Sequence, residues 1–150
     1  MIKKDKIWLY LDDIRIPTEG DWQVVRNYDD FVAHILMNGL ENYEVISLDH
    51  DLGPSAMKEY YNNVHPNNKL EYDNILEKTG YDCAKFLVNE SLRLDIRLPE
   101  VYTHSANPIG SANIIGYINN YLKNCHLPQT CQRVRIPFRV EGKDYENNTF

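Results

Sequence analysis

The sequence predicts a single α/β domain built on a mainly parallel sheet of about five strands, with helices on both faces. Three short apolar runs, at residues 7–11, 45–48 and 101–103, have the length and composition of strands buried in a parallel sheet. Segments with apolar residues at helical spacing lie between and after these runs. Strands that alternate with helices favour a parallel sheet over an antiparallel one.

Each of the three apolar runs ends in side chains that can carry chemistry. In open α/β sheets, ligands bind beyond the carboxyl ends of the strands, so these exits predict one site assembled from three loops. The exits read Asp12-Asp13-Ile14-Arg15, Asp49-His50-Asp51 and His104-Ser105-Ala106-Asn107.

Length and composition fit one domain spanning residues 1–150. A chain of 150 residues can bury a core without metal or disulfide staples. Its three cysteines are an odd number with no CxxC pair, and the first residues lack the apolar run of a signal peptide. No window approaches the ~20 apolar residues of a membrane span. We therefore expect a reduced, cytoplasmic protein that does not enter a membrane, and the net charge of −6 argues against broad nonspecific nucleic-acid binding.

The first third of the chain predicts two strands, a helix and a third strand. After the strand at 7–11, Pro17 and Gly20 mark a turn that leads to a short strand at 22–26. Asn27 is a suitable N-cap for the next segment, whose apolar residues keep helical spacing until Gly39. The strand at 45–48 follows.

The stretch 54–78 is polar and long for a connection in a compact domain. We expect a helical turn or two around residues 57–61 within a loop that is otherwise irregular or disordered. Such a loop is a candidate substrate lid or a surface for a protein partner.

The last part of the chain predicts two helices and an edge strand. One helix opens at 79–82 and ends before Pro99, a strand covers 100–104, and Asn107 with Pro108 begins a second helix that runs to about Asn124. Residues 131–140 alternate apolar with polar side chains, and Pro137 restricts them to the edge of the sheet. The polar tail at 141–150 is expected to fray.

The clustered carboxylates at two exits predict a metal site. Carboxylates repel one another unless they share protons or bind a cation, and their hard oxygen atoms suit Mg²⁺ or Mn²⁺. We expect Asp12, Asp13 and Asp49 to hold the metal. Asp51 has a simpler explanation as a residue that shapes the turn.

His50 and His104 each follow a predicted strand and are the candidate catalytic residues. If those strands are neighbours, their axes lie roughly 4.8 Å apart, so the two imidazoles could face one bound group as general acid and base. A single histidine usually has a structural explanation, but two at equivalent exits beside acidic residues favour function.

A phosphate site is predicted beside the metal. Arg15 could hold phosphate oxygens or form an ion pair with a neighbouring carboxylate. The helix start at Ser105, Asn107 and Gly110 offers free N–H groups that attract anions, and Gly110 has no side chain to keep a phosphate away. An ordinary capped helix would also explain Asn107 followed by proline.

These motifs together resemble receiver domains, and in particular the divergent family of cyclic-phosphate processing receiver domains. The resemblance covers most of residues 7–122 and implies a flavodoxin-like, receiver-like three-layer sandwich that handles cyclic phosphates. Ordinary receivers carry a lysine after the fifth strand, whereas this chain offers Arg133 or Arg135 and no lysine before Lys143. The matching segments are 11–17, 47–53, 79–82 and 104–108.

The leading functional hypothesis is a metal-dependent phosphoesterase that opens a cyclic phosphate, either a cyclic nucleotide or an RNA end with a 2′,3′-cyclic phosphate. The main alternative is a noncatalytic receiver-like module that binds a phosphate ligand or a protein partner. This alternative includes a signalling phosphoacceptor at Asp49. A third reading is a structural or inhibitory interaction protein.

Overall fold

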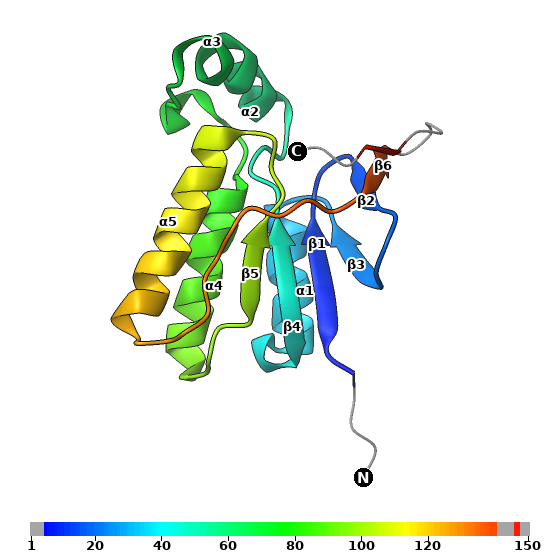
Figure 1. Ribbon diagram of the computed structural model, residues 1–150, viewed down its shortest axis with the longest axis vertical. Coiled ribbons are helices and arrows are strands. Elements are labelled where there is room, and N and C mark those ends of the chain that lie inside the picture. The colour runs from blue at the N-terminus through cyan, green and yellow to red at the C-terminus, as the bar shows by residue number, and fades with distance from the viewer. Residues whose placement is uncertain (1–4, 141–145, 148–150) are drawn as a thin grey trace.

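The structure is a computed structural model that describes residues 5–140 and 146–147, and it has the predicted flavodoxin-like, receiver-like α/β fold (Figure 1). Its main sheet is parallel throughout and has four strands in the order β3-β1-β4-β5. The strands are β1 (Ile7–Leu11), β3 (Trp22–Val25), β4 (Tyr43–Leu48) and β5 (Glu100–Thr103).

The long helices begin where their capping residues predict. Asn27 precedes α1 (Tyr28–Asn38) and accepts a hydrogen bond from the backbone N–H of Asp30. Thr79 precedes α4 (Gly80–Leu94) and forms a reciprocal capping box with Asp82. Asn107 precedes α5 (Pro108–Asn124). Gly39, at a φ of 83°, ends α1 and leads into the 3₁₀ turn η1 (Leu40–Asn42).

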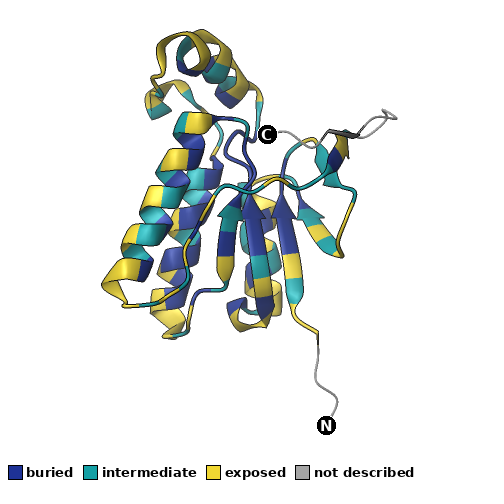
Figure 2. Ribbon diagram, viewed as in Figure 1, coloured by how far each residue is buried: buried dark blue, intermediate teal, exposed yellow. Residues whose placement is uncertain are grey.

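These three helices lie together on one face of the sheet, with α4 packed between α1 and α5 (Figure 1). The expectation of helices on both faces is therefore wrong for the described residues. Buried residues gather between the helices and the sheet, while exposed residues cover the outer helix surfaces (Figure 2). The buried core there includes Leu9, Leu11, Ile46, Leu48, Phe31, Ile35, Leu87, Ile114 and Ile118.

The predicted edge strand at 131–140 is reduced to two short pieces, so the sheet has four strands instead of about five. Arg133 makes one parallel bridge with Thr103 at the end of β5. Pro137 has no N–H to continue a ladder, and the chain crosses the open face of the sheet to form β6 (Phe138–Val140) (Figure 1). There β6 pairs antiparallel with β2 (Arg15–Pro17) and with β7 (Glu146–Asn147). Most of the predicted frayed tail at 141–150 lies outside the described residues.

The segment 54–78 is more helical than predicted. It contains α2 (Pro54–Glu59), the π-helical turn η2 (Tyr60–Val64), α3 (His65–Asn67) and the 3₁₀ turn η3 (Tyr72–Asn74). In Figure 1 it forms a cap above the carboxyl ends of the strands. Hydrogen bonds to two acidic side chains connect the parts of this segment. Glu59 accepts from Asn63, Glu71 and Asn74. Glu77 accepts from Ser55 and Ala56.

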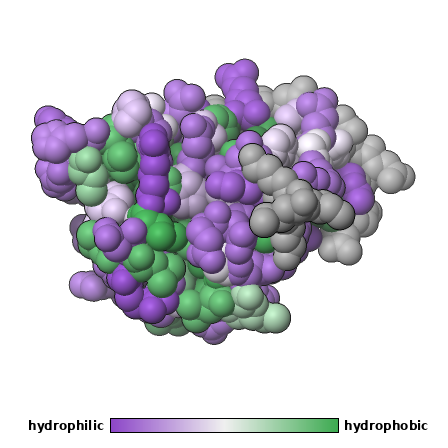
Figure 3. All heavy atoms as spheres, turned by 90° about the horizontal axis from the view of Figure 1, so that it is seen from below, coloured by the Kyte–Doolittle hydropathy of each residue, from purple (hydrophilic) through white to green (hydrophobic). Residues whose placement is uncertain are grey.

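The end of the molecule at which the strands begin shows a mixed surface. Seen from below in the orientation of Figure 1, it is mostly hydrophilic with separate apolar patches (Figure 3). Among the described residues, no helix is both long enough and apolar enough to cross a membrane.

Candidate functional site

The exits of β1, β4 and β5 lie side by side because their backbones remain hydrogen-bonded beyond the last strand residues. The N–H of Asp49 donates to the carbonyl of Leu11 at 2.9 Å, and the N–H of His104 donates to the carbonyl of Leu48 at 3.1 Å. The structure thus brings together the three loops that the sequence predicted to form one site.

Asp12, Asp13 and Asp49 form the acidic centre of this site. One carboxylate oxygen from each residue lies within 4.8 Å of the others. Asp12 is fully buried, and its Oδ1 accepts hydrogen bonds from the backbone N–H groups of Ile14 and Arg15 at 3.0 and 2.8 Å. Three converging carboxylates of this kind fit a small divalent cation with hard character.

The three carboxyl groups differ in their proton affinity. Burial opposes ionisation of Asp12, but the hydrogen bond from His104 and those from the backbone hold its pKa below the usual value. Burial and the charge of Asp12 raise the pKa of Asp49 well above its usual value. The same two causes raise the pKa of Asp13 to about 6.

His104 lies behind the acidic centre and holds Asp12. Burial lowers the pKa of His104, so the ring is neutral and carries one N–H. Because a carboxylate can only accept, Nε2 donates to Asp12 Oδ2 at 3.1 Å and Nδ1 accepts from the Ser47 hydroxyl at 2.7 Å. The ring also stacks on Tyr10 at 4.2 Å. Both nitrogens are therefore engaged, and His104 positions Asp12.

His50 does not face His104 across a shared ligand as predicted. Its side chain is fully buried, with Nδ1 2.6 Å from Asp51 Oδ1 and Nε2 3.0 Å from the Tyr72 hydroxyl. The amide of Asn113 donates to the same hydroxyl, which leaves the tyrosine proton free to donate to Nε2. The helix α5 holds the ring in this position, because its Gly110 packs directly against the imidazole of His50.

Gly110 consequently does not offer the predicted approach for a phosphate. A Cβ at this position would collide with the His50 ring, so the glycine serves packing. Asn107 caps the N–H groups of Ile109 and Gly110 with its Oδ1, which removes donors that were predicted to attract an anion. Its Nδ2 donates to both oxygens of Asp51, at 3.2 and 3.4 Å.

Arginine side chains approach the site from the β2 and β6 side. The Arg15 guanidinium donates to the carbonyl of His104 at 3.1 Å, lies over the ring of Phe138, and has its Nε 3.8 Å from Asp12 Oδ2. Arg133 donates through two nitrogens to the carbonyl of Ser105. The ion pair predicted for Arg15 as one alternative is thus present, with Asp12 as its partner. Phosphate binding by Arg15 stays a prediction.

The whole arrangement follows the order of a receiver domain, with an acidic pair after β1, Asp49 after β4 and Ser105 after β5. A family model described as Cyclic-phosphate processing Receiver domain matches residues 7–120. The chain belongs to this family. It is a receiver-like domain associated with cyclic-phosphate processing, as its motifs predicted. No curated protein and no solved structure matched the chain.

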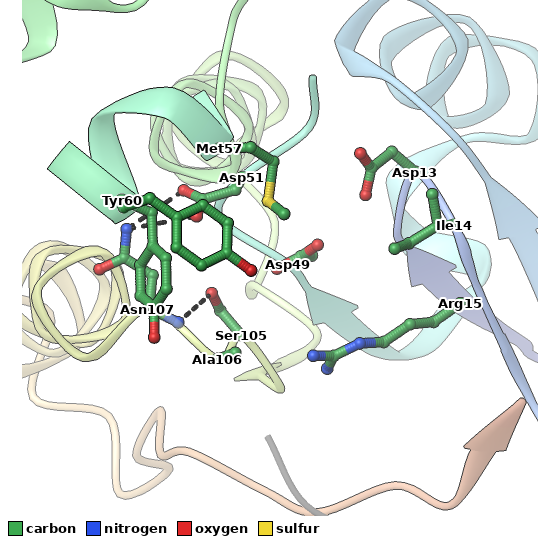
Figure 4. Close-up of a pocket in the computed structure, with 11 residues that line it drawn as sticks. Asp13, Ile14, Arg15, Asp49, Asp51, Met57, Tyr60, Ser105, Ala106 and Asn107 are labelled. Atoms are coloured by element: carbon green, nitrogen blue, oxygen red, sulfur yellow. Dashed lines mark hydrogen bonds between the residues drawn. The ribbon is translucent and has the colours of Figure 1, made fainter. Parts of the chain in front are cut away.

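This cyclic-phosphate processing receiver domain has a pocket of ≈ 200 Å³ above its acidic residues (Figure 4). Asp13, Arg15 and Asp49 line it, as does Ser105, whose buried hydroxyl accepts from the N–H of Asn107. Three further lining residues come from the segment 54–78. Figure 4 shows Met57 and Tyr60 across the pocket from Asp13 and Arg15. The complete lining is Asp13, Ile14, Arg15, Asp49, Asp51, Met57, Tyr60, Tyr61, Ser105, Ala106 and Asn107.

Six lining residues were not among the predicted site residues, and Ile14 and Ala106 are two of them. Asp51, expected only to shape the turn, lines the pocket between His50 and Asn107. Met57, Tyr60 and Tyr61 come from the segment that was predicted as a candidate lid or partner surface with a helical turn or two around residues 57–61. The adjacent tyrosines inside a stretch too long for a connection were the available signal.

Proposed function

We propose that this receiver-like domain hydrolyses a cyclic phosphate with the help of Mg²⁺ or Mn²⁺. The observation that carries the proposal is the acidic centre of Asp12, Asp13 and Asp49, of which Asp13 and Asp49 line the same pocket as Arg15. A cation bound by these carboxylates would stabilise charge on the phosphate and make a bound water more acidic. The family membership supports a cyclic phosphate as the substrate.

The residues of the chain have separate tasks in this reaction. Arg15 binds phosphate oxygens through its guanidinium, which borders the pocket and is only partly engaged by the carbonyl of His104. Asp51 is the carboxylate that accepts a proton, because it lines the pocket and is held by His50 and Asn107. His104 positions Asp12.

The reaction that these residues support adds one water across one ester bond. The water oxygen bonds to phosphorus while its proton passes to Asp51, and one P–O bond of the ring breaks. The proton held by Asp51 then passes through solvent to the leaving oxygen, so Asp51 is again a carboxylate and the product is a phosphate monoester with a free hydroxyl. The histidines, originally expected to exchange these protons directly, act one step further from the substrate.

The test is a panel of 2′,3′-cyclic nucleotides, 3′,5′-cyclic nucleotides and RNA ends with a 2′,3′-cyclic phosphate, assayed with Mg²⁺ or Mn²⁺. We expect turnover of at least one substrate class and its loss on chelation. Asp49→Asn should lower kcat/KM by at least about 100-fold, since metal sites depend steeply on ligand charge.

Asp73→Asn is the matched control, because Asp73 is exposed and lies outside the pocket. It should retain the wild-type rate. The proposal fails if no substrate on the panel is turned over, or if Asp49→Asn is as active as the wild type.

A second candidate is a phosphoacceptor at Asp49. It is favoured by one observation, that Asp49 and the receiver-type hydroxyl residue Ser105 line the same pocket. Incubation with a small phosphodonor and intact-mass measurement would show a gain of one phosphoryl group that Asp49→Asn lacks. No gain in the wild type would exclude it.

A further inference from the structure

The pocket has two chemically distinct walls. Asp13 and Arg15 lie on one side, and Met57 of α2 and Tyr60 of η2 lie across the pocket from them (Figure 4). Tyr61, which follows Tyr60 in η2, also lines the pocket. Resting on the proposed function, we propose that Tyr60 and Tyr61 form a stacking wall for a nucleobase. The substrate class is then a nucleotide whose cyclic phosphate faces Arg15, in preference to a cyclic phosphate without a base.

The exposure of this wall favours a planar ligand. Tyr61 is 63% exposed and Met57 38% exposed at the rim of the pocket. The rings of Tyr60 and Tyr61 meet edge to face, with centroids 5.2 Å apart and planes at 81°. In such a pair the edge of one ring covers one face of the other, so each ring keeps at least one face that its partner does not cover. Aromatic faces at a pocket rim are the groups on which bases stack in single-stranded nucleic-acid sites.

The wall is held in place before any ligand arrives. Glu59 precedes Tyr60, is 4% exposed, and accepts hydrogen bonds from the backbone of Glu71 and the side chains of Asn63 and Asn74. Glu77 joins the start of α2 to the end of the segment. A wall that is already ordered costs little entropy when it binds a ligand. The π-helical turn that begins at Tyr60 is a feature found frequently at functional sites.

The charge and size of the pocket indicate that a second part of the ligand, besides the phosphate, must contribute to the binding free energy. Asp13, Asp49 and Asp51 repel an anion wherever their charge is not neutralised, so phosphate contacts alone give a weak hold. The volume of ≈ 200 Å³ is below the roughly 300–1,000 Å³ of pockets that enclose drug-sized ligands. The phosphate end therefore fills the pocket, and the base lies on the exposed tyrosine at the rim. A protein partner would need a much larger contact area.

The experiment compares Tyr61→Ala and Tyr61→Phe on two substrates. A 2′,3′-cyclic nucleotide carries a base, and the cyclic phosphate of glycerol does not. Tyr61→Ala should raise KM for the nucleotide roughly 5- to 100-fold, the range for loss of one stacked base, and change kcat less. Tyr61→Phe should restore the wild-type KM, because stacking needs the ring and not the hydroxyl. The glycerol compound should show the same KM in all three proteins.

Leu76→Ala is a control within the same segment, because Leu76 is 92% exposed and does not line the pocket. An unchanged nucleotide KM in Tyr61→Ala overturns the inference and leaves the proposed function intact. An equal rise in KM for the glycerol compound in Tyr61→Ala also overturns the inference and leaves the proposed function intact. If Tyr61→Phe behaves like Tyr61→Ala, the hydroxyl acts by hydrogen bonding and stacking is excluded.

A binding measurement separates this inference from the proposed function. If no cyclic phosphate is turned over, the proposed hydrolysis is wrong. Calorimetric titration with a nucleoside 3′-monophosphate then tests whether the tyrosines stack on a base. Weaker binding by Tyr61→Ala, with wild-type affinity in Tyr61→Phe, supports the wall. Equal affinity in the wild type and Tyr61→Ala, or no binding at all, overturns it.

Discussion

Tyr10 has an unusual environment for a tyrosine. Its side chain is fully buried on the face of the sheet opposite the helices, where its ring stacks on His104 and meets the edge of Trp22. Within the described part of the chain, its hydroxyl has no hydrogen-bond partner. Burial, followed by the charge of Asp12, raises the pKa of this phenol. The ring thus supports the histidine that holds Asp12, while the hydroxyl is an energetic cost.

Tyr10→Phe should therefore stabilise the protein. The substitution keeps the ring and removes a buried group that has lost its hydration, for a gain of about 1 kcal/mol. Thermal unfolding should show a rise in Tm of about 2–4 °C. Tyr117→Phe is the control, because the ring of Tyr117 is only half-buried, and it should leave Tm unchanged. A lower Tm for Tyr10→Phe would mean that the hydroxyl has a stabilising partner.

At the scale of single residues, the sequence identified the side chains that follow the strands directly. Asp12, Asp13 and Asp49 could be predicted because parallel strands end at one edge of a sheet. The orientation of His50 could not, because it depends on Gly110 and Tyr72, which are distant in sequence. Sequence position places a side chain at an exit, and only packing decides whether it faces the ligand.

Among the elements, α4 shows how closely helix and site are joined. Gly80 begins this helix, and its N–H donates to the carbonyl of His50 at 2.9 Å. A Cβ at Gly80 would collide with the backbone carbonyl of Asp49. The glycine is needed for this close approach, and its backbone needs no left-handed conformation. Gly116 in α5 offers a contrast, because a Cβ there would meet nothing within 4 Å.

Gly80→Ala and Gly116→Ala should have opposite effects. Overpacking against a backbone that cannot move freely should lower the free energy of unfolding of Gly80→Ala by about 1–3 kcal/mol. Gly116→Ala should raise it by about 0.5–1 kcal/mol, since alanine is the better helix former. Urea denaturation of both variants measures the two changes. Equal stability of the pair would contradict the close packing of α4 on the exit of β4.

Elements with strong local signals were predictable, and those that depend on distant contacts were not. The predicted N-caps Asn27 and Asn107 located two helices from the sequence, and the segment 79–82 located the start of a third. The segment 54–78 lacks a clear apolar period, because its order comes from Glu59 and Glu77 rather than from an amphipathic face. The alternation at 131–140 correctly indicated β-pairing. It did not indicate that Arg133 would pair with β5 while residues 138–140 pair with β2.

The whole molecule combines a receiver core with a C-terminal extension that reaches back to the site. The family model ends at residue 120, yet Arg133 holds the carbonyl of Ser105 and Phe138 lies under the guanidinium of Arg15. With all three long helices on one face, this crossing chain borders the other face near the strand exits (Figure 1). Contacts to Ser105 and Arg15, which line the pocket, thus come from outside the residues that the family model matches.

The carboxylates of the site connect its chemistry to the stability of the whole molecule. The pKa of Asp13 is raised in the folded state to about 6 from an ordinary value of 3.8. A raised pKa favours folding at low pH, so this contribution is fully present below about pH 4 and is lost as pH rises through 6. The proposed cation would bind the ionised carboxylates, so its stabilising effect would have the opposite pH dependence.

Mn²⁺ should therefore stabilise the protein at pH 7.5 and lose this effect as the pH falls through 6. At a free concentration 100 times its Kd, the gain is about 2.7 kcal/mol, or a rise in Tm of about 5–10 °C. Asp13→Asn removes one ligand charge together with its repulsion, so this variant should have a higher metal-free Tm at pH 7.5 and respond less to Mn²⁺. Thermal unfolding with Mn²⁺ and with chelator, at pH 5 and pH 7.5, measures both effects. If Tm at pH 7.5 is the same with Mn²⁺ and with chelator, the carboxylates hold no such cation, and the charge repulsion among them must be relieved by protons instead.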